Sequence, residues 1–302
     1  MSGAFNYEQA FQRNIGWFTR EEQQSLRGKR VAVAGLGGCG GSYVTTLARL
    51  GVGAFTLSDF DSFELANFNR QAGARVSTIG APKVDVIRAM ALDINPELDI
   101  RTFPEGVQDD KIDAFLKGAD LFVDAIDIFA LETRRKIYAR CRALKIPAVF
   151  SAPAGMGAAF LIFMPDGMPF EDWYRFESVE PSKRLVNFLI GTVPAGLHRS
   201  YMADWSSVNL ETRDFPSTGL AVELCAGVTI AQGVKILLGR GTIEAVPYYH
   251  HFDAYKCVYK KGRIRGGNAN WLQRIKLKLA YREFDKLAKR PRPNSMGQPA
   301  PA

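Results

Sequence analysis

The feature that most constrains the fold is a glycine-rich turn set between an apolar run and a helical pattern. Residues 30–61, RVAVAGLGGCGGSYVTTLARLGVGAFTLSDFD, are typical of a strand, a turn, a helix and a second strand. Glycines at such a turn permit close approach of a phosphate, and the helix N-terminus supplies N–H donors. The G-x-G-x-x-G spacing is formed by Gly35, Gly37 and Gly40, with Gly38 beside them.

Two acids, Asp59 and Asp61, close the second strand. Asp59 lies 19 residues beyond Gly40, where a carboxylate can accept hydrogen bonds from ribose hydroxyls. The pattern therefore predicts a nucleotide site. It does not distinguish between NAD, FAD and ATP as the bound nucleotide. The alternative to a nucleotide site is a glycine turn with a purely structural role.

Apolar strands alternate with helical periodicity through the first half of the chain. Strands are predicted at 31–35, 54–59, 98–103, 120–125 and 147–151, and helices at 40–51, 82–95, 108–117 and 130–144. Thr19 and Glu22 have the spacing of a capping box, which predicts a short helix before the first strand. The alternation indicates an α/β fold, a Rossmann-like, doubly wound and mainly parallel sheet with helices on both faces.

The second half of the chain is less regular. One more strand is predicted at 157–164, a long crossover excursion without clear elements at 165–218, and a helix at 221–239 followed by strands within 243–264. The run 219–239 contains Glu223, Gln232 and Lys235, so we expect a buried helix and not a membrane span. The Pro-rich end of the chain is expected to be disordered.

Charge and composition point to a globular protein with a basic C-terminal segment. The 302 residues are 47% hydrophobic and 23% charged, and the N-terminus lacks a signal-peptide pattern, so we expect a cytoplasmic protein. The net charge is +8, and residues 260–292 carry twelve Lys or Arg against Glu283 and Asp285. The predicted amphipathic basic helix at 270–290 fits tRNA, an acidic protein partner, an anionic membrane surface, or only solvent.

Cysteine and histidine do not form a recognisable site. Cys39, Cys141, Cys225 and Cys257 include no C-x-x-C pair, so neither a zinc site nor a disulfide framework is predicted, and we expect reduced, mostly buried thiols. His198, His250 and His251 fit no nucleophilic triad, and we expect ordinary surface or core histidines.

Polar residues after the second strand favour ATP over a dinucleotide. Asn67, Arg70, Gln71 and Lys83 are expected near the carboxyl edge of the sheet, where cations can stabilise pyrophosphate as it leaves. Asp124 and Asp127 end another predicted strand, and a carboxylate there can hold Mg²⁺. The alternatives are solvated surface groups for the first set and helix caps for the two acids. No G-x-x-x-x-G-K-[ST] motif is present.

Together these residues resemble the ThiF/MoeB/HesA group, the bacterial relatives of ubiquitin-activating enzymes. The resemblance rests on GLGGCG, LSDFDSFELANFNRQ, IGAPKV, VDAID and GVTIAQGVKILLG, in the family's order over about residues 10–260. It implies an adenylyltransferase that uses ATP to activate a carboxylate, often the C-terminus of a small ubiquitin-like or sulfur-carrier protein. A peptide or a tRNA-linked threonylcarbamoyl group are other substrates that the family allows.

The resemblance also implies roles for single residues. Asp59 looks like the ribose ligand, with Asp61 beside it, and Asp127 like the Mg²⁺-linked aspartate. Asn67, Arg70 and Lys83 look like contacts of the triphosphate and the transition state, supported by Gln71. Arg13 resembles an arginine that reaches the partner's ATP across a homodimer. An adenylation domain would then occupy 1–265, with a nucleotide-binding half at 28–164, the excursion at 165–218 and a return at 219–265, and the basic tail would be 266–302.

Three departures from the family's pattern are visible. The two C-x-x-C pairs that hold zinc in many relatives are missing, and the excursion has no cysteine to form a thioester. We therefore expect Cys225 to be structural. Ile128 stands where a polar Asn is common. The competing interpretations are a redox or sensor protein that binds NAD or FAD, and a nucleotide-binding scaffold that has lost catalysis.

Overall fold

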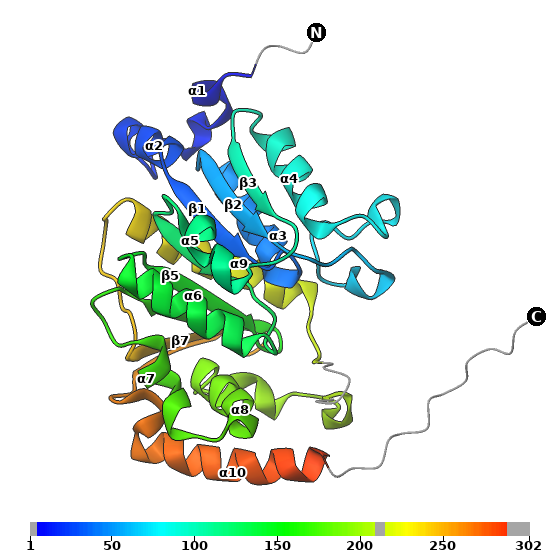
Figure 1. Ribbon diagram of the computed structural model, residues 1–302, viewed down its shortest axis with the longest axis vertical. Coiled ribbons are helices and arrows are strands. Elements are labelled where there is room, and N and C mark those ends of the chain that lie inside the picture. Colours follow the sequence, from blue (N-terminus) through cyan, green and yellow to red (C-terminus); the bar gives the residue numbers. More distant parts are fainter. Residues whose placement is uncertain (1–4, 209–214, 289–302) are drawn as a thin grey trace, which may run out of the picture.

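The protein is built on one mixed sheet of eight strands. The computed structural model describes residues 5–208 and 215–288, with side chains as far as Phe284. The strands lie in the order β3-β2-β1-β4-β5-β6-β7-β8 (Figure 1). They are β1 (Arg30–Ala34), β2 (Ala54–Ser58), β3 (Asp99–Phe103), β4 (Leu121–Asp124), β5 (Ala148–Pro153), β6 (Gly157–Phe163), β7 (Tyr248–Asp253) and β8 (Val258–Arg263). The first five strands are parallel, and β6, β7 and β8 are antiparallel to their neighbours.

Helices cover both faces of this sheet, as the alternating pattern predicts. They are α1 (Tyr7–Ala10), α2 (Arg20–Arg27), α3 (Gly38–Arg49), α4 (Lys83–Ile94), α5 (Ile112–Leu116), α6 (Leu131–Ala143), α7 (Phe170–Tyr174), α8 (Pro181–Thr192), α9 (Gly219–Leu237) and α10 (Trp271–Ala288). Val31 and Val33 of β1 pack with residues of α3, α4 and α9, whereas Ala32 and Ala34 pack with residues of α5 and α6. Successive residues of a strand face opposite sides, so one apolar strand serves two cores. The predicted doubly wound α/β class is confirmed.

The predicted capping box is also present. The Thr19 hydroxyl accepts from the Glu22 N–H at 3.1 Å, and the Glu22 carboxylate accepts from the Thr19 N–H at 2.9 Å. The cap starts α2 and leads the chain into β1.

The described part of the 165–218 excursion is more ordered than its sequence pattern suggests. Residues 209–214 lie outside the described chain, but α7 and α8 precede them. Trp173, Tyr174 and Phe188 are almost fully buried, and they pack on the sheet face that also holds α6. Prolines that look disruptive start these helices, since Pro169 is the N-cap of α7 and Pro181 is the first residue of α8.

The apolar run near residue 230 forms a core helix, as predicted. Helix α9 is the one described helix long and apolar enough to cross a membrane. Nine of its residues are buried, and it packs against α3, β5 and β6. The position of α9 in the core of the fold therefore explains its length and its high hydropathy.

The predicted basic helix is α10, at the end of the molecule farthest from α1 (Figure 1). Its Leu277 and Ala280 are buried against Val186 of α8. The Pro-rich end that we expect to be disordered begins beyond Ala288 and lies outside the described residues. The division into a domain at 1–265 and a tail stays a prediction.

Candidate functional site

The glycine turn is packed against the end of β4, and this fixes glycine at two positions. Gly35 has a φ of +84°, and a Cβ there would lie 2.1 Å from the Ala125 carbonyl oxygen. A Cβ on Gly40 would lie 1.8 Å from the Gly35 carbonyl oxygen. Helix α3 follows at once, with Gly37 as its N-cap and, within the described residues, no side chain capping it. Its first N–H groups are therefore available to a bound anion.

Asp59 ties the end of β2 to this turn. Its Oδ2 accepts from the Leu36 N–H at 2.6 Å, and its Oδ1 accepts from the Asp61 N–H at 2.8 Å. Burial raises the pKa of Asp59, although these two N–H groups and Lys83 act in the opposite direction. Each carboxylate oxygen keeps a second lone pair, so the side chain can still accept a hydrogen bond from a ribose hydroxyl.

Lys83 is a buried cation beside the same strand end. Its side chain is 7% exposed, and Nζ donates to Oδ2 of Asp61 at 3.0 Å, while the Asp61 carboxylate is 52% exposed. Lys83 is also the first residue of α4, where the helix dipole disfavours a positive charge. The ammonium has three N–H donors, and the hydrogen bond to Asp61 uses one of them, so Nζ can also donate to an anionic ligand.

The loop between β2 and α4 brings Gln71 to the glycine turn, and Arg70 precedes it in the same loop. Gln71 is 8% exposed, its Oε1 is buried without a hydrogen-bond partner in the described part of the chain, and its amide lies against Gly37. Arg70 donates from Nη1 to the Ala66 carbonyl at 3.0 Å and to Asn69 Oδ1 at 2.9 Å. Asn67 has a structural role in this loop, because its Oδ1 accepts a hydrogen bond from the Glu64 N–H at 3.0 Å.

The start of α9 closes the far side of this loop. Asn69 donates to the Ser217 carbonyl at 2.8 Å, and Glu223 accepts from the Ser42 hydroxyl of α3 at 2.8 Å. Loop, glycine turn and α9 are thus held together although α9 is distant in the sequence.

Asp124 and Asp127 have different environments. Asp124 is fully buried, with Oδ1 accepting from the Ile126 N–H at 2.9 Å and Oδ2 accepting from Nε of Arg134 at 2.7 Å. It is therefore not available to a metal ion. Asp127 is exposed, and its Oδ1 accepts from the Phe129 N–H at 2.8 Å. Neither acid is the N-cap of α6, which is Ala130.

Arg134 is the residue of this region that sequence reasoning missed. It also donates from Nη1 to the Asp127 carbonyl at 3.2 Å and from Nη2 to the Ile126 carbonyl, so it holds the whole turn that carries Asp127. Its guanidinium lies 4.6 Å from the Phe188 ring centroid. The available signal was an arginine ten residues after Asp124 in a helix that packs on the sheet. Ile128, in the same turn, packs on the neighbouring apolar core.

Arg13 lies away from the site of its own chain. The next residue, Asn14, donates to the carbonyl of Arg49, at the end of α3 opposite the glycine turn, over 3.5 Å. The 12 residues of α3 separate the two points by about 18 Å. Arg13 itself is exposed.

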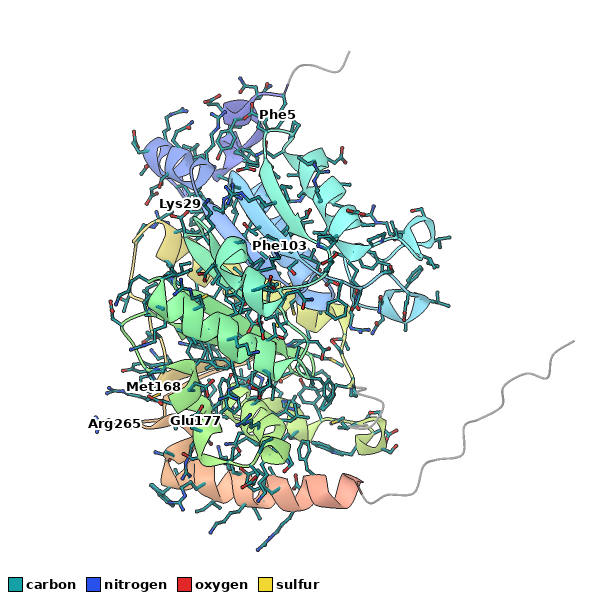
Figure 2. The ribbon with its side chains drawn as sticks, viewed as in Figure 1. Phe5, Lys29, Phe103, Met168, Glu177 and Arg265 are labelled. Carbon is teal, nitrogen blue, oxygen red and sulfur yellow. The ribbon has the colours of Figure 1, made fainter. Side chains whose placement is uncertain are left out.

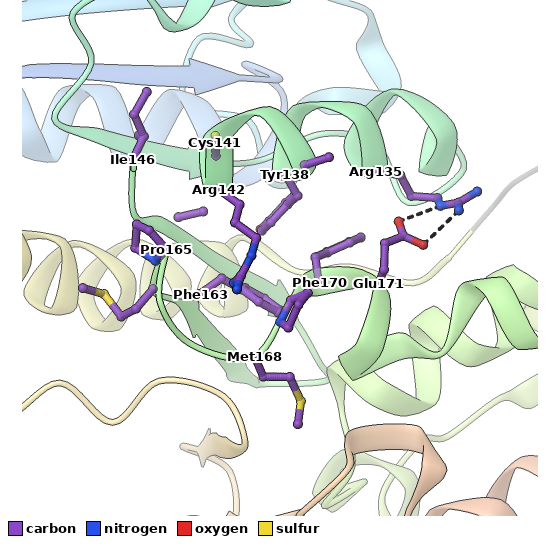
Figure 3. Close-up of a pocket in the computed structure, with 14 residues that line it drawn as sticks. Arg135, Tyr138, Cys141, Arg142, Ile146, Phe163, Pro165, Met168, Phe170 and Glu171 are labelled. Carbon is purple, nitrogen blue, oxygen red and sulfur yellow. Dashed lines mark hydrogen bonds and ion pairs between the residues drawn. The ribbon is translucent and has the colours of Figure 1, made fainter. Parts of the chain in front are cut away.

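A cavity of about 200 Å³ lies at the opposite edge of the parallel strands. Figure 3 shows it between α6 and the connection from β6 to α7, with Arg135 and Glu171 paired at 2.7 Å on its rim. None of the predicted site residues lines it. Its aromatic residues and Met168 belong to the core on that face, whereas Met164 packs on the core of the other face.

The thiols and histidines stay outside the predicted chemistry. Cys39, Cys141 and Cys225 are buried, and Cys257 is exposed. Burial raises the pKa of Cys225, which opposes formation of a thiolate. No group of three His, Cys, Asp or Glu suited to a metal ion occurs among the described residues.

Comparison with known proteins agrees with this architecture. A sequence model described as the ThiF family matches residues 11–270. The molybdopterin-synthase adenylyltransferase of Escherichia coli (strain K12) is 35% identical over 153 residues, which cover 50% of this chain and 61% of that protein. The tRNA threonylcarbamoyladenosine dehydratase of Bacillus subtilis (strain 168) is 35% identical over 150 residues, covering 49% and 57%. Each match spans less than two thirds of the relative's own length.

Solved structures share the fold at low sequence identity. A crystal structure of PaaA superposes with a TM-score of 0.66 at 20% identity, covering 87% of this chain and 85% of that one. A structure of E. coli MccB with ATP superposes with a TM-score of 0.60 at 18% identity, covering 80% and 65%. With the family match over most of its length, the chain belongs to the ThiF family.

Proposed function

We propose that this protein is an ATP-dependent adenylyltransferase. A substrate carboxylate oxygen attacks the α-phosphorus of ATP, the bond from that phosphorus to the bridging oxygen breaks, and pyrophosphate leaves with the electron pair. The product is an acyl-adenylate. No protein nucleophile is needed, because the carboxylate is the nucleophile and the protein supplies position and charge.

The observation that carries the proposal is Lys83. A buried ammonium paired with Asp61, next to the Asp59 carboxylate that binds the glycine turn, suits a triphosphate, whose leaving group gains negative charge during the reaction. A dinucleotide used for hydride transfer leaves no role for this cation together with Arg70. Asp59, at the end of the neighbouring strand, would accept from the ribose hydroxyls.

Mg²⁺ fits the donor set at the end of β4. Asp127 is the exposed carboxylate there. Its Oδ1 accepts the hydrogen bond from the Phe129 N–H, and its Oδ2 takes no part in that hydrogen bond and could bind the ion. When bound, the ion would neutralise phosphate charge. Arg134 would keep the Asp127 turn in position, and Gln71 would pack the glycine turn from the other side.

The carboxylate that we favour is the C-terminus of a small ubiquitin-like or sulfur-carrier protein, or of another peptide. The relative named molybdopterin-synthase adenylyltransferase supports a protein substrate, because its name gives a protein as the molecule that is adenylylated. A tRNA-linked threonylcarbamoyl group is the second candidate, supported by the dehydratase relative and by the basic charge after residue 260. We also infer a cytoplasmic location.

A homodimer would complete the site. Asn14, next to Arg13, contacts the end of α3 that lies about 18 Å from the glycine turn, so we infer that another copy brings Arg13 to a nucleotide. Trp17, Phe60, Leu65 and Val76 are 70–82% exposed, and such apolar side chains on the N-terminal segment and the loop before α4 suit an interface.

The deciding experiment is ATP–pyrophosphate exchange with candidate carboxylates. We expect exchange in the wild type and its loss, by a factor on the order of 10² or more, in Asp127→Ala and Arg70→Ala. Asp172→Ala and Arg88→Ala, at exposed positions on α7 and α4, are matched controls that should keep the wild-type rate.

Two results would contradict the proposal. Tight dinucleotide binding without exchange would favour the redox or sensor protein. ATP binding without exchange for every carboxylate would favour a scaffold without catalysis.

A further inference from the structure

The outward side of α10 carries an exposed apolar row. Trp271, Leu272, Ile275 and Leu279 are 66%, 52%, 50% and 53% exposed. Their spacing of three and four residues places them on one side of the helix. A row of four large apolar side chains in water is unfavourable, and it marks a contact surface when it is contiguous.

The opposite side of α10 already packs on the body of the protein, so the exposed apolar row is not the side of the helix that belongs to the core. Gln273, Leu277 and Ala280 are at most 4% exposed. Tyr281 donates to Asn187 of α8, and Lys276 donates to the Pro194 carbonyl at 2.8 Å. The helix is therefore fixed on the body before any partner binds, and its outward side stays free within the described chain.

Positive charge surrounds the apolar row. Arg274, Lys278 and Arg282 lie on the same outward side and are exposed. Glu283, the acid that follows Arg282 in the sequence, is paired with Arg199 at 3.0 Å. Figure 2 shows side chains of α10 extending away from the body, with Arg265 projecting at the same end of the molecule. We define the α10 face as Trp271, Leu272, Arg274, Ile275, Lys278, Leu279 and Arg282.

We propose that the α10 face docks the protein on an anionic lipid surface. A lipid interface accepts both parts of the face, since the apolar side chains enter the acyl boundary while the long basic side chains reach the head groups. Attraction between the basic side chains and anionic lipids adds a second favourable contribution to the binding free energy. The helix, 18 residues and about 27 Å long, lies along one outer edge of the molecule, which suits a planar surface (Figure 1).

Nucleic acid fits the same face less well. A phosphate backbone would pair with the three basic residues but would leave the apolar row in water. None of the predicted site residues lies on α10, so docking leaves the nucleotide site open. The inference does not depend on adenylation.

Vesicle co-sedimentation of the full chain tests the inference. We expect sedimentation with vesicles that contain phosphatidylglycerol, and weak or no sedimentation with pure phosphatidylcholine. The apolar variant Leu272→Ser/Ile275→Ser/Leu279→Ser and the charge variant Arg274→Gln/Lys278→Gln/Arg282→Gln should each bind about tenfold or more weakly. The charge control Arg88→Gln/Lys111→Gln/Lys117→Gln removes three exposed cations from the body and should bind like the wild type.

Tryptophan emission gives an independent readout. The anionic vesicles should shift the emission to shorter wavelength, and Trp271→Phe should lose most of the shift. Thermal unfolding checks that each variant is folded, which we expect because the changed side chains are exposed.

Three outcomes would overturn the proposal. The first is no binding of the wild type to the anionic vesicles. The second is binding of the apolar variant as strong as that of the wild type. The third is a loss of binding in the charge control as large as that in the charge variant. Binding to tRNA that is unaffected by the apolar variant, with no vesicle binding, would assign the face to nucleic acid instead.

Discussion

Arg134 and Asp124 form an ion pair of 2.7 Å between two side chains that are both fully buried. The pair joins α6 to the end of β4, and the same guanidinium donates to the carbonyls of Ile126 and Asp127. One arginine thus compensates a buried carboxylate and fixes the turn that carries the candidate Mg²⁺ ligand.

Breaking this pair should destabilise the fold strongly. Arg134→Met leaves the Asp124 carboxylate buried without a counter-charge, and we expect a loss of about 3–5 kcal/mol in the free energy of unfolding, measured by urea denaturation. The double variant Arg134→Met/Asp124→Leu should recover a large part of this loss, because no charge remains uncompensated. A double variant as unstable as the single one would show that the charge is not the cause.

Lys83 should behave in the opposite way, with little effect on stability and a large effect on activity. Lys83→Met removes a cation from a helix N-terminus together with its ion pair to the half-exposed Asp61, and because these two effects oppose each other we expect the free energy of unfolding to stay within about 1 kcal/mol of the wild type. ATP–pyrophosphate exchange should fall by a factor on the order of 10² or more. Lys111→Met is an exposed control at which neither quantity should change. A loss of stability that matches the loss of activity would assign Lys83 a structural role.

His251 should make the fold sensitive to acid. It is fully buried, and both ring nitrogens lack a hydrogen-bond partner among the described residues. Burial, with His198 nearby, lowers the pKa of His251 to about 4, while Asp253 acts in the opposite direction. The unfolded chain takes up this proton near its ordinary pKa of 6.5, so stability should fall as the pH drops from about 6.5 to about 4 and then level off.

The His251 effect is on the order of 2 kcal/mol between pH 8 and pH 5, and about 3 kcal/mol once the pH falls below 4. His251→Leu should remove this part of the pH dependence. The difference in the free energy of unfolding between variant and wild type should therefore be more favourable to the variant at pH 5 than at pH 8. Burial also lowers the pKa of His198 and His250, so a weaker slope of the same sign should remain. An unchanged difference between variant and wild type across this range would contradict the assignment.

The sequence predicts the framework well because the signals for it are local. The strand starting at Arg30, the glycine turn and α9 each follow from periodicity and from glycine within one short segment. The carboxyl edge of a parallel sheet then brings Asp59, Lys83 and Asp127 into one region, as the strand order requires.

The sequence fails where tertiary contacts decide the structure. Helices α7 and α8 are stabilised by aromatic packing, such as Tyr174 on Phe188 with ring centroids 5.0 Å apart, which no local pattern reveals. Arg134 looks like a surface residue of a polar helix until α6 is placed on the sheet. The unequal environments of Asp124 and Asp127 have the same origin, since only the packed fold buries one and exposes the other.

Subunit mixing tests whether Arg13 acts on a partner's nucleotide. In the proposed homodimer, Arg13→Ala would remove the contact to the partner's nucleotide and Asp127→Ala the proposed Mg²⁺ ligand, so each variant alone should be nearly inactive in exchange. After the two variants are mixed and allowed to exchange subunits, half of the dimers should be mixed, and each should contain one intact site. Activity should therefore recover to about a quarter of the wild-type value. A mixture as inactive as its components, although subunit exchange is verified, would mean that Arg13 serves its own chain or that the protein acts as a monomer. Arg20→Ala, an exposed position on α2, is the matched control and should be fully active without mixing.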